Sequence, residues 1–169
     1  MAGSVQNDFE DVEAGEPRRL LPQPGVYPAE YVTHFIRKFA SWGEKLIFEW
    51  KVFTNPNLDP KQTVKLCRYY NVKRTRAGKF CFGDGHDYRK DWIAANGGRL
   101  PLDRGKVPFT VFQNKTMLVA VGSVTKDAQR PLSPSSYWSK IEWIVGPLEE
   151  GKMIDRLPLE PLDSSRQLP

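Results

Sequence analysis

The chain has 169 residues, of which 40% are hydrophobic and 12% aromatic, enough for one domain with a substantial core. No run approaches the ~20 apolar residues of a membrane span, and the first residues lack the apolar core of a signal peptide, so the sequence predicts a cytoplasmic protein with no membrane partner. The two cysteines, Cys67 and Cys81, are too few for a disulfide framework, and we expect both to be reduced.

The net charge of +5 is distributed unevenly. Residues 1–24 hold five acids and two bases (−3), and residues 148–169 hold five acids and three bases (−2), so residues 25–147 carry 20 bases and 10 acids, a net +10. Basic patches raise both the rate and the affinity of binding to phosphate backbones. The charge therefore favours a polyanion-binding body, with a solvated basic surface that has no ligand as the alternative.

The N-terminal residues 1–24 are acidic and then rich in proline, and we expect them to be disordered. The domain begins at Gly25, where GVYPAEYVTHFIRKF alternates as a bent or bulged strand with Tyr27 and Phe35 on one face. A turn that contains Trp42 ends this strand.

The second and third strands alternate most clearly. LIFEWKVF has four apolar residues on its inward face, Leu46, Phe48, Trp50 and Val52. In VKLCRYYNVKR, Arg68 and Tyr70 face inward, whereas Lys65, Tyr69 and Lys73 face outward. A buried unpaired arginine is costly, so Arg68 lies at an open end of the fold or the register is shifted by one residue.

FGDGHDYRKDWIAANGG changes to a helical period and predicts a helix over 86–96, with Asp84 as its N-cap. TMLVAVGSVT and YWSKIEWIV are the fourth and fifth strands. The fifth strand is expected to have three apolar residues on one face, Ile141, Trp143 and Val145. Residues 148–169 are expected to be a flexible C-terminal tail.

The order strand, strand, strand, helix, strand, strand is that of an OB-fold, which binds oligonucleotides on its second and third strands. We therefore expect a mainly β domain over 25–147, a five-stranded OB-like barrel with one helix between strands 3 and 4, flanked by disordered acidic tails. Between Lys61 and Lys79 the chain carries seven basic residues and no acidic one, with Tyr69 and Tyr70 inside the run. This combination of charge and rings is typical of a single-stranded nucleic-acid groove.

Five stretches carry a family resemblance: GVYPAEYVTHF, EKLIFEWKVF, LCRYYNV, HDYRKDWIAANGG and NKTMLVAVGSVTK. With the last strand they cover residues 25–145, and they resemble small phage- and mobile-element-encoded single-stranded-DNA-binding-like proteins of OB-fold type. The resemblance implies a non-enzymatic protein of low sequence preference that handles single strands during DNA replication or recombination. Replication or recombination proteins are the protein partners it implies.

We expect the nucleic acid to contact the second and third strands and the basic loop after them. Tyr69 is expected to face outward and stack on bases. Phe53, which points outward with Lys51, and Trp42 are further stacking candidates, and each could equally cap the core. The predicted contact residues are Lys51, Phe53, Lys65, Arg68, Tyr69, Lys73, Arg74, Arg76 and Lys79. No cofactor, metal or catalytic residue is expected.

Two other functions stay open. One is an interaction or inhibitor protein of a mobile element that docks its basic face on an acidic protein. The other is a metal-dependent nuclease built on three aligned acids, Asp84, Asp87 and Asp91, although acids in a first turn also stabilise a helix directly. The spacings of His34, Cys67, Cys81 and His86 fit no zinc module. DNA and RNA are not distinguished.

Overall fold

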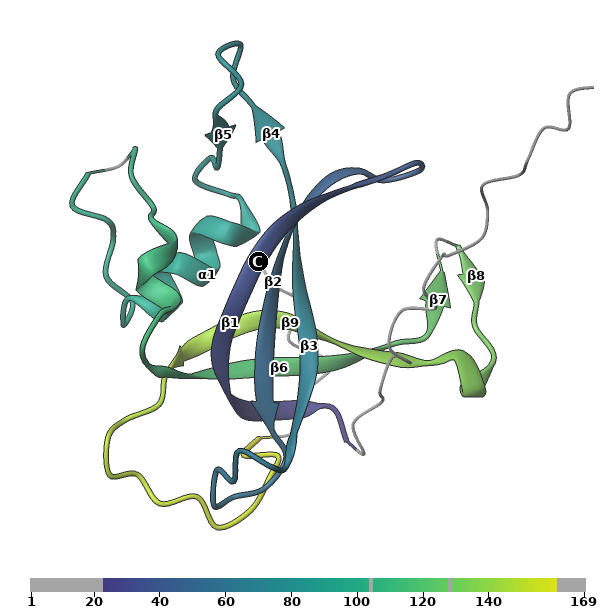
Figure 1. Ribbon diagram of the computed structural model, residues 1–169, viewed down its shortest axis with the longest axis vertical. Helices are drawn as coiled ribbons and strands as arrows, with labels where there is room; N and C mark the ends of the chain where they lie inside the picture. Colours follow the sequence, from purple (N-terminus) through teal and green to yellow (C-terminus); the bar gives the residue numbers. More distant parts are fainter. Residues whose placement is uncertain (1–22, 104, 128, 161–169) are drawn as a thin grey trace, which may run out of the picture.

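The computed structural model describes residues 23–103, 105–127 and 129–160. Strands dominate the fold, and five of them form an antiparallel sheet in the order β3–β2–β1–β6–β9 (Figure 1). These strands are β1 (Gly25–Phe39), β2 (Gly43–Phe53), β3 (Thr63–Asn71), β6 (Thr116–Val124) and β9 (Trp138–Pro147). The prediction of a mainly β domain is confirmed.

Two short hairpins and one α-helix lie outside this sheet. The strand β4 (Lys73–Arg74) pairs with β5 (Phe80–Cys81), and β7 (Lys126–Asp127) pairs with β8 (Arg130–Pro131). The helix α1 (Asp87–Ala95) lies between β5 and β6 in the chain, in agreement with the predicted helix over 86–96. Two 3₁₀ helices follow, η1 (Phe109–Phe112) and η2 (Pro134–Ser136). No helix in the described ranges is long and apolar enough to cross a membrane.

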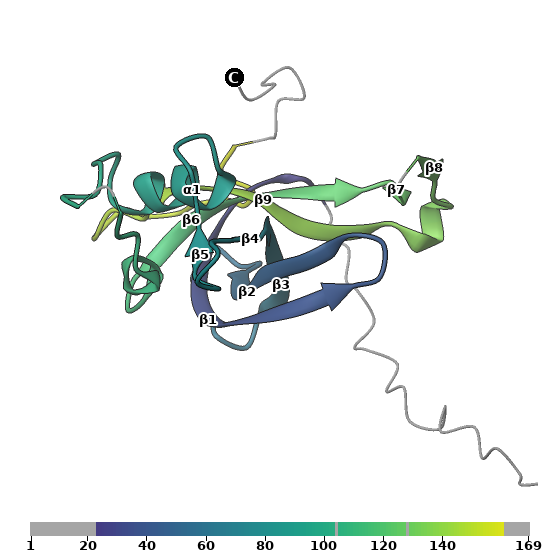
Figure 2. The same cartoon turned by 90° about the horizontal axis from the view of Figure 1, so that it is seen from above.

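The sheet curls because β1 pairs with two different strands along its length. Its first part, from Gly25 to Glu30, pairs with β6, and its second part, from Ala29 to Phe39, pairs with β2. Figure 2 shows the result, with β1, β2 and β3 turned away from β6 and β9. The two edge strands, β3 and β9, are thereby brought into contact.

A β-bulge between Tyr31 and Thr33 reverses the faces of β1. Before the bulge, Tyr27 is buried in the core, whereas after it His34 faces inward, with its ring 4.2 Å from that of Phe109. Phe35 consequently turns outward and is 42% exposed. The predicted bend is confirmed, but the expectation that Phe35 shares a face with Tyr27 is wrong.

The core is an aromatic cluster centred on β2. Its four predicted inward residues, Leu46, Phe48, Trp50 and Val52, are all buried, as expected from the alternation. Phe48 packs edge-on against five rings with centroids no more than 5.9 Å away, those of Tyr31, Tyr70, Tyr88, Phe109 and Phe112. Tyr88 and Trp92 belong to α1, which thus covers one end of the curled sheet.

Two register shifts in β9 change the face that the sequence predicts for this strand. They lie opposite β6, between Leu118 and Val119 and between Ala120 and Val121. Ile141 and Ile144 are buried as a result, but Trp143 is only half-buried and Val145 is 42% exposed. A bulge inserts one extra residue, so strict alternation fails across it.

The segment after β9 packs against the start of β1. Val26 N donates to Glu160 O and Leu159 N donates to Val26 O, both at 2.9 Å. Leu157 packs on the core, and a Cβ on Gly25 would lie 2.4 Å from Pro158 Cβ. The predicted flexible tail from 148 onward is therefore docked as far as Glu160. Residues 161–169, and residues 1–22 of the predicted N-terminal tail, lie outside the described residues.

Candidate nucleic-acid interface

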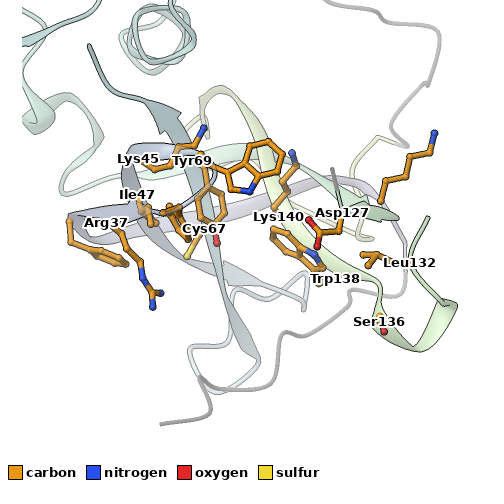
Figure 3. Close-up of a pocket in the computed structure, with 14 residues that line it drawn as sticks. Arg37, Lys45, Ile47, Cys67, Tyr69, Asp127, Leu132, Ser136, Trp138 and Lys140 are labelled. Carbon is orange, nitrogen blue, oxygen red and sulfur yellow. The ribbon is translucent and has the colours of Figure 1, made fainter. Parts of the chain in front are cut away.

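A groove of about 690 Å³ lies on the outer face of β2 and β3 (Figure 3). The β1–β2 hairpin borders it on one side, and β7, η2 and the start of β9 border it on the other. Figures 1 and 2 both show the tips of the β1–β2 and β7–β8 hairpins projecting on the same side of the molecule. The residues that line the groove are Phe35, Arg37, Phe39, Trp42, Lys45, Ile47, Cys67, Tyr69, Lys126, Asp127, Leu132, Ser136, Trp138 and Lys140.

The first wall of the groove is produced by the bulge in β1 and the register of β1, β2 and β3. Phe35 pairs with Ile47, and Ile47 pairs with Tyr69, so the three side chains form one row across three strands. Arg37 and Lys45 form the next row. Ile47 is only 3% exposed although it lies on the outward face, because it forms the floor of the groove.

Large aromatic rings converge on the groove from three elements. Tyr69 on β3 meets Trp138 on β9 edge-on, with ring centroids 6.2 Å apart. Trp42, in the turn between β1 and β2, is 54% exposed, and Lys45 Nζ lies 6.0 Å from the centre of its ring. Such rings, partly exposed and next to cations, can stack on planar ligands.

The groove is predominantly basic. Its lining includes four cations, Arg37, Lys45, Lys126 and Lys140, and one acid, Asp127, a net +3. Lys140 Nζ pairs with Glu142 Oε2 at 3.5 Å, but the described residues offer Arg37, Lys45 and Lys126 no carboxylate within salt-bridge distance. The net charge of the lining favours anionic over cationic groups in the groove.

Of the nine contact residues predicted from the sequence, Tyr69 is the one that lines the groove. Lys51 and Lys65 lie on the same outward face but farther along, where they pair with Glu30 at 2.9 Å and Glu49 at 3.6 Å. Phe53 is only 3% exposed, with Lys51 Nζ 5.3 Å from its ring centre. Of the two alternatives for Phe53, the structure excludes an outward stacking face, because the ring is covered.

Arg68 points inward, as its position in the alternation predicts, and it is neither at an open end nor out of register. Its Nε donates to Asp91 Oδ2 at 2.7 Å, and the Tyr70 hydroxyl donates to the same oxygen at 2.8 Å. Ile144 N donates to Asp91 Oδ1 at 3.0 Å. One carboxylate on α1 thus joins β3 to β9, and Arg68, only 8% exposed, is withdrawn from any ligand.

Burial and charge act against each other in this cluster. Burial opposes the positive charge of Arg68, but the neighbouring Asp91 carboxylate outweighs it and raises the pKa of the guanidinium. Burial, reinforced by the same carboxylate, raises the pKa of Tyr70 well above its ordinary value. Burial also raises the pKa of Asp91, while Arg68 and the Ile144 amide oppose that shift. With three donors on its two oxygens, Asp91 acts as an ionised structural link.

The basic residues after β3 lie on the exposed β4–β5 hairpin, which continues β3 beyond the groove (Figure 1). Arg74 is engaged within the protein, because its Nε contacts Glu44 Oε2 at 2.8 Å and its Nη1 donates to Gly78 O at 2.9 Å. For Lys73, Arg76 and Lys79, no salt bridge to another described residue is formed. These three side chains extend the positive surface from the Lys45 end of the groove.

The polar residues at the start of α1 have structural roles. His86, and not the predicted Asp84, caps the helix: its Nδ1 accepts from Tyr88 N at 3.1 Å and its Nε2 donates to Asn71 O at 2.6 Å. Asp84 instead pairs with Arg89 Nε at 3.2 Å. In the part of the chain that the structure describes, no group of three or more His, Cys, Asp or Glu side chains is arranged to hold a metal ion.

Sequence reasoning missed the rest of the groove, in particular Arg37, Lys126, Trp138 and Lys140. The available signal was the predicted OB-like order itself, since such folds bind through strands 2 and 3 together with the loops that join strands 1–2 and 4–5. SWGEK and KDAQRPLSPSS occupy those two positions in the chain. Comparisons with protein-family models, curated proteins and solved structures give no match for this chain, so its function is inferred from the groove's own residues.

Proposed function

We propose that this protein is a non-catalytic single-stranded nucleic-acid-binding protein with an OB-like fold. The sheet order β3–β2–β1–β6–β9 and the position of α1 between β3 and β6 support this assignment. In OB-folds the ligand lies on the second and third strands, between the loops that follow strands 1 and 4. The groove lies on β2 and β3, between the turn after β1 and the β7–β8 hairpin.

The observation that carries the proposal is the lining of the groove. Five aromatic residues, Phe35, Phe39, Trp42, Tyr69 and Trp138, share it with four cations. Base–aromatic stacking contributes about 1–3 kcal/mol per base and tolerates any sequence, while cations hold the backbone. A groove for a neutral apolar ligand would have no need of the net +3 charge.

The β4–β5 hairpin extends this surface for the phosphate backbone. Asn71 ends β3 and accepts a hydrogen bond from Lys45 Nζ, so the groove and the hairpin meet at this pair. A strand that leaves the groove here passes Lys73, Arg76 and Lys79. The affinity is then expected to fall with salt, with a slope of about −0.7 per phosphate contacted.

Single strands are favoured over duplexes because only unstacked bases expose their faces to protein rings. We would measure fluorescence anisotropy with a labelled thymidine strand of about twelve nucleotides and with the matching duplex. The strand should bind more tightly than the duplex, and the double variant Trp42→Ala/Trp138→Ala should lose most of this binding.

Trp143→Ala is the matched control, because Trp143 is a half-buried tryptophan that does not line the groove. Equal binding of strand and duplex, or a double variant that binds like Trp143→Ala, would overturn the proposal. A wild-type protein that binds no oligonucleotide but captures an acidic protein would support the interaction-protein alternative instead.

A further inference from the structure

The two walls of the groove differ in charge. The β1–β2 wall carries Arg37 and Lys45 and no lining acid. The opposite wall carries Lys126, Lys140 and Asp127, and Lys140 is paired with Glu142, so that wall has no net charge when Glu142 is included. Figure 3 shows Arg37 and Lys45 on one side of Tyr69, and Asp127, Trp138 and Ser136 on the other.

Asp127 differs from every other acid on the described strands. Glu30, Glu44, Glu49 and Glu142 each pair with a lysine or arginine within 4.0 Å. Asp127 forms no such pair among the described residues, although it lies in a basic groove. An exposed carboxylate at this point repels phosphate, so it is useful only where the ligand presents hydrogen-bond donors.

We infer that the groove orients a single strand with its phosphates along Arg37 and Lys45 and its bases toward Trp138 and Asp127, and that Asp127 selects guanine. This inference rests on the proposed function. A polynucleotide has an anionic edge and a base edge that carries donors, and these edges match the two walls. Trp138 provides a ring beside Asp127, so a base stacked there would have its edge next to the carboxylate.

Guanine fits a carboxylate better than the other bases do. Its Watson–Crick edge presents two adjacent donors, N1–H and the N2 amino group, which can bond the two carboxylate oxygens at once. Adenine and cytosine present one amino group beside a ring-nitrogen acceptor, which repels the second oxygen. Thymine and uracil present one N–H between two carbonyl oxygens. A bidentate contact of this kind corresponds to roughly 5- to 140-fold discrimination between bases.

The test uses four strands of about twelve nucleotides: one of thymidine alone, and three thymidine strands that carry isolated guanine, hypoxanthine or 7-deazaguanine bases. Hypoxanthine lacks only the N2 amino group, whereas 7-deazaguanine keeps the whole Watson–Crick edge. The wild-type protein should bind the guanine and 7-deazaguanine strands equally, and the hypoxanthine strand several-fold more weakly. Asp127→Asn should abolish the difference between guanine and hypoxanthine and should tighten binding of the all-thymidine strand, because it removes a negative charge.

Glu150→Gln is the matched control, because Glu150 is an exposed acid outside the groove, and this variant should keep the preference for guanine. Wild-type protein that binds the guanine, hypoxanthine and 7-deazaguanine strands equally would overturn the guanine inference while leaving the proposed function standing. An Asp127→Asn variant that keeps the preference would do the same. Failure of every strand to bind would overturn the proposed function itself.

Discussion

The two faces of β3 put similar residues to opposite uses. Arg68 and Tyr70 face inward and bind the Asp91 carboxylate, which links the strand to β9 through Ile144. Tyr69, between them in the chain, faces outward and lines the groove beside Trp138. An arginine and two tyrosines in a row therefore divide between the buried carboxylate cluster and the lining of the groove. The partner that each side chain meets, and not its residue type, decides which role it has.

Removal of the inward carboxylate should have the largest effect. Asp91→Ala leaves Arg68, Tyr70 and the Ile144 amide without their shared acceptor, and loss of one member of a buried ion pair costs about 3–5 kcal/mol. Urea unfolding would measure this loss. Asp84→Ala is the control, since its carboxylate pairs with Arg89 but is 96% exposed, and it should change the free energy of unfolding by about 0–1 kcal/mol. Equal stability of the two variants would show that the inward face does not depend on Asp91.

Truncation of the outward ring should affect binding and spare the fold. Tyr69→Ala should weaken single-strand binding by about 1–3 kcal/mol, with little change in the salt slope, because stacking is not ionic. Tyr70→Phe is the inward counterpart: it removes one buried hydrogen bond, which should cost stability by about 1–2 kcal/mol without weakening binding. Salt titrations and urea melts of both variants check the pair. A Tyr69→Ala protein that unfolds readily would contradict the division between faces.

Charge on the β4–β5 hairpin should change the salt dependence more than the affinity at low salt. We expect a triple variant to bind with a weaker dependence on salt when glutamine replaces Lys73, Arg76 and Lys79. The slope of log affinity against log salt should fall in magnitude by about 0.7 for each phosphate that the protein no longer neutralises. The charge-matched control is a triple variant in which Lys51, Lys61 and Lys65 are changed to glutamine. These residues also lie outside the groove, and two of them are paired with acids. A slope that falls equally in both triple variants would indicate general attraction without a path along the hairpin.

A pH effect at His34 should be the smallest. Burial against the aromatic core lowers the pKa of His34 below its ordinary 6.5. The unfolded chain then takes up a proton before the folded one does, so stability should decline as pH falls through 6.5 and should level off below the folded-state pKa. His34→Phe keeps a ring on Phe109 and removes this titration. Thermal melts between about pH 7.5 and pH 5 should show a flatter profile for the variant, and an unchanged profile would assign the pH dependence elsewhere.

Local patterns in the sequence predicted much of the inward face. Alternation in β2 and β3 identified Phe48, Trp50 and Tyr70 as inward and Tyr69 as outward, because the side-chain period of a strand is a local property. The helix was predicted for the same reason, from its spacing and its terminal glycines.

The groove could not be predicted in the same way. Its walls come from segments that are distant in the chain, β1–β2 and β7–β9, and each bulge changes the face of every residue beyond it. The basic run was visible as composition, but its acidic partners, Glu44, Glu49 and Asp91, lie on other elements. Residues that looked like ligand contacts were therefore partly neutralised by folding.

The bulge in β1 gives this strand one residue that it can lose without exchanging its two faces. Val32 is the extra residue of the bulge, so its deletion would keep the pairing with β2 on both sides, with His34 still inward and Phe35 still outward. The pairing of β2 with β3 has no such extra residue, and deletion of one residue within β2 would turn every later side chain of the strand to the other face. In a lineage of such proteins, loss of one codon would be tolerated at the bulge of β1, whereas the same loss in β2 would exchange interior and outer residues in a single step.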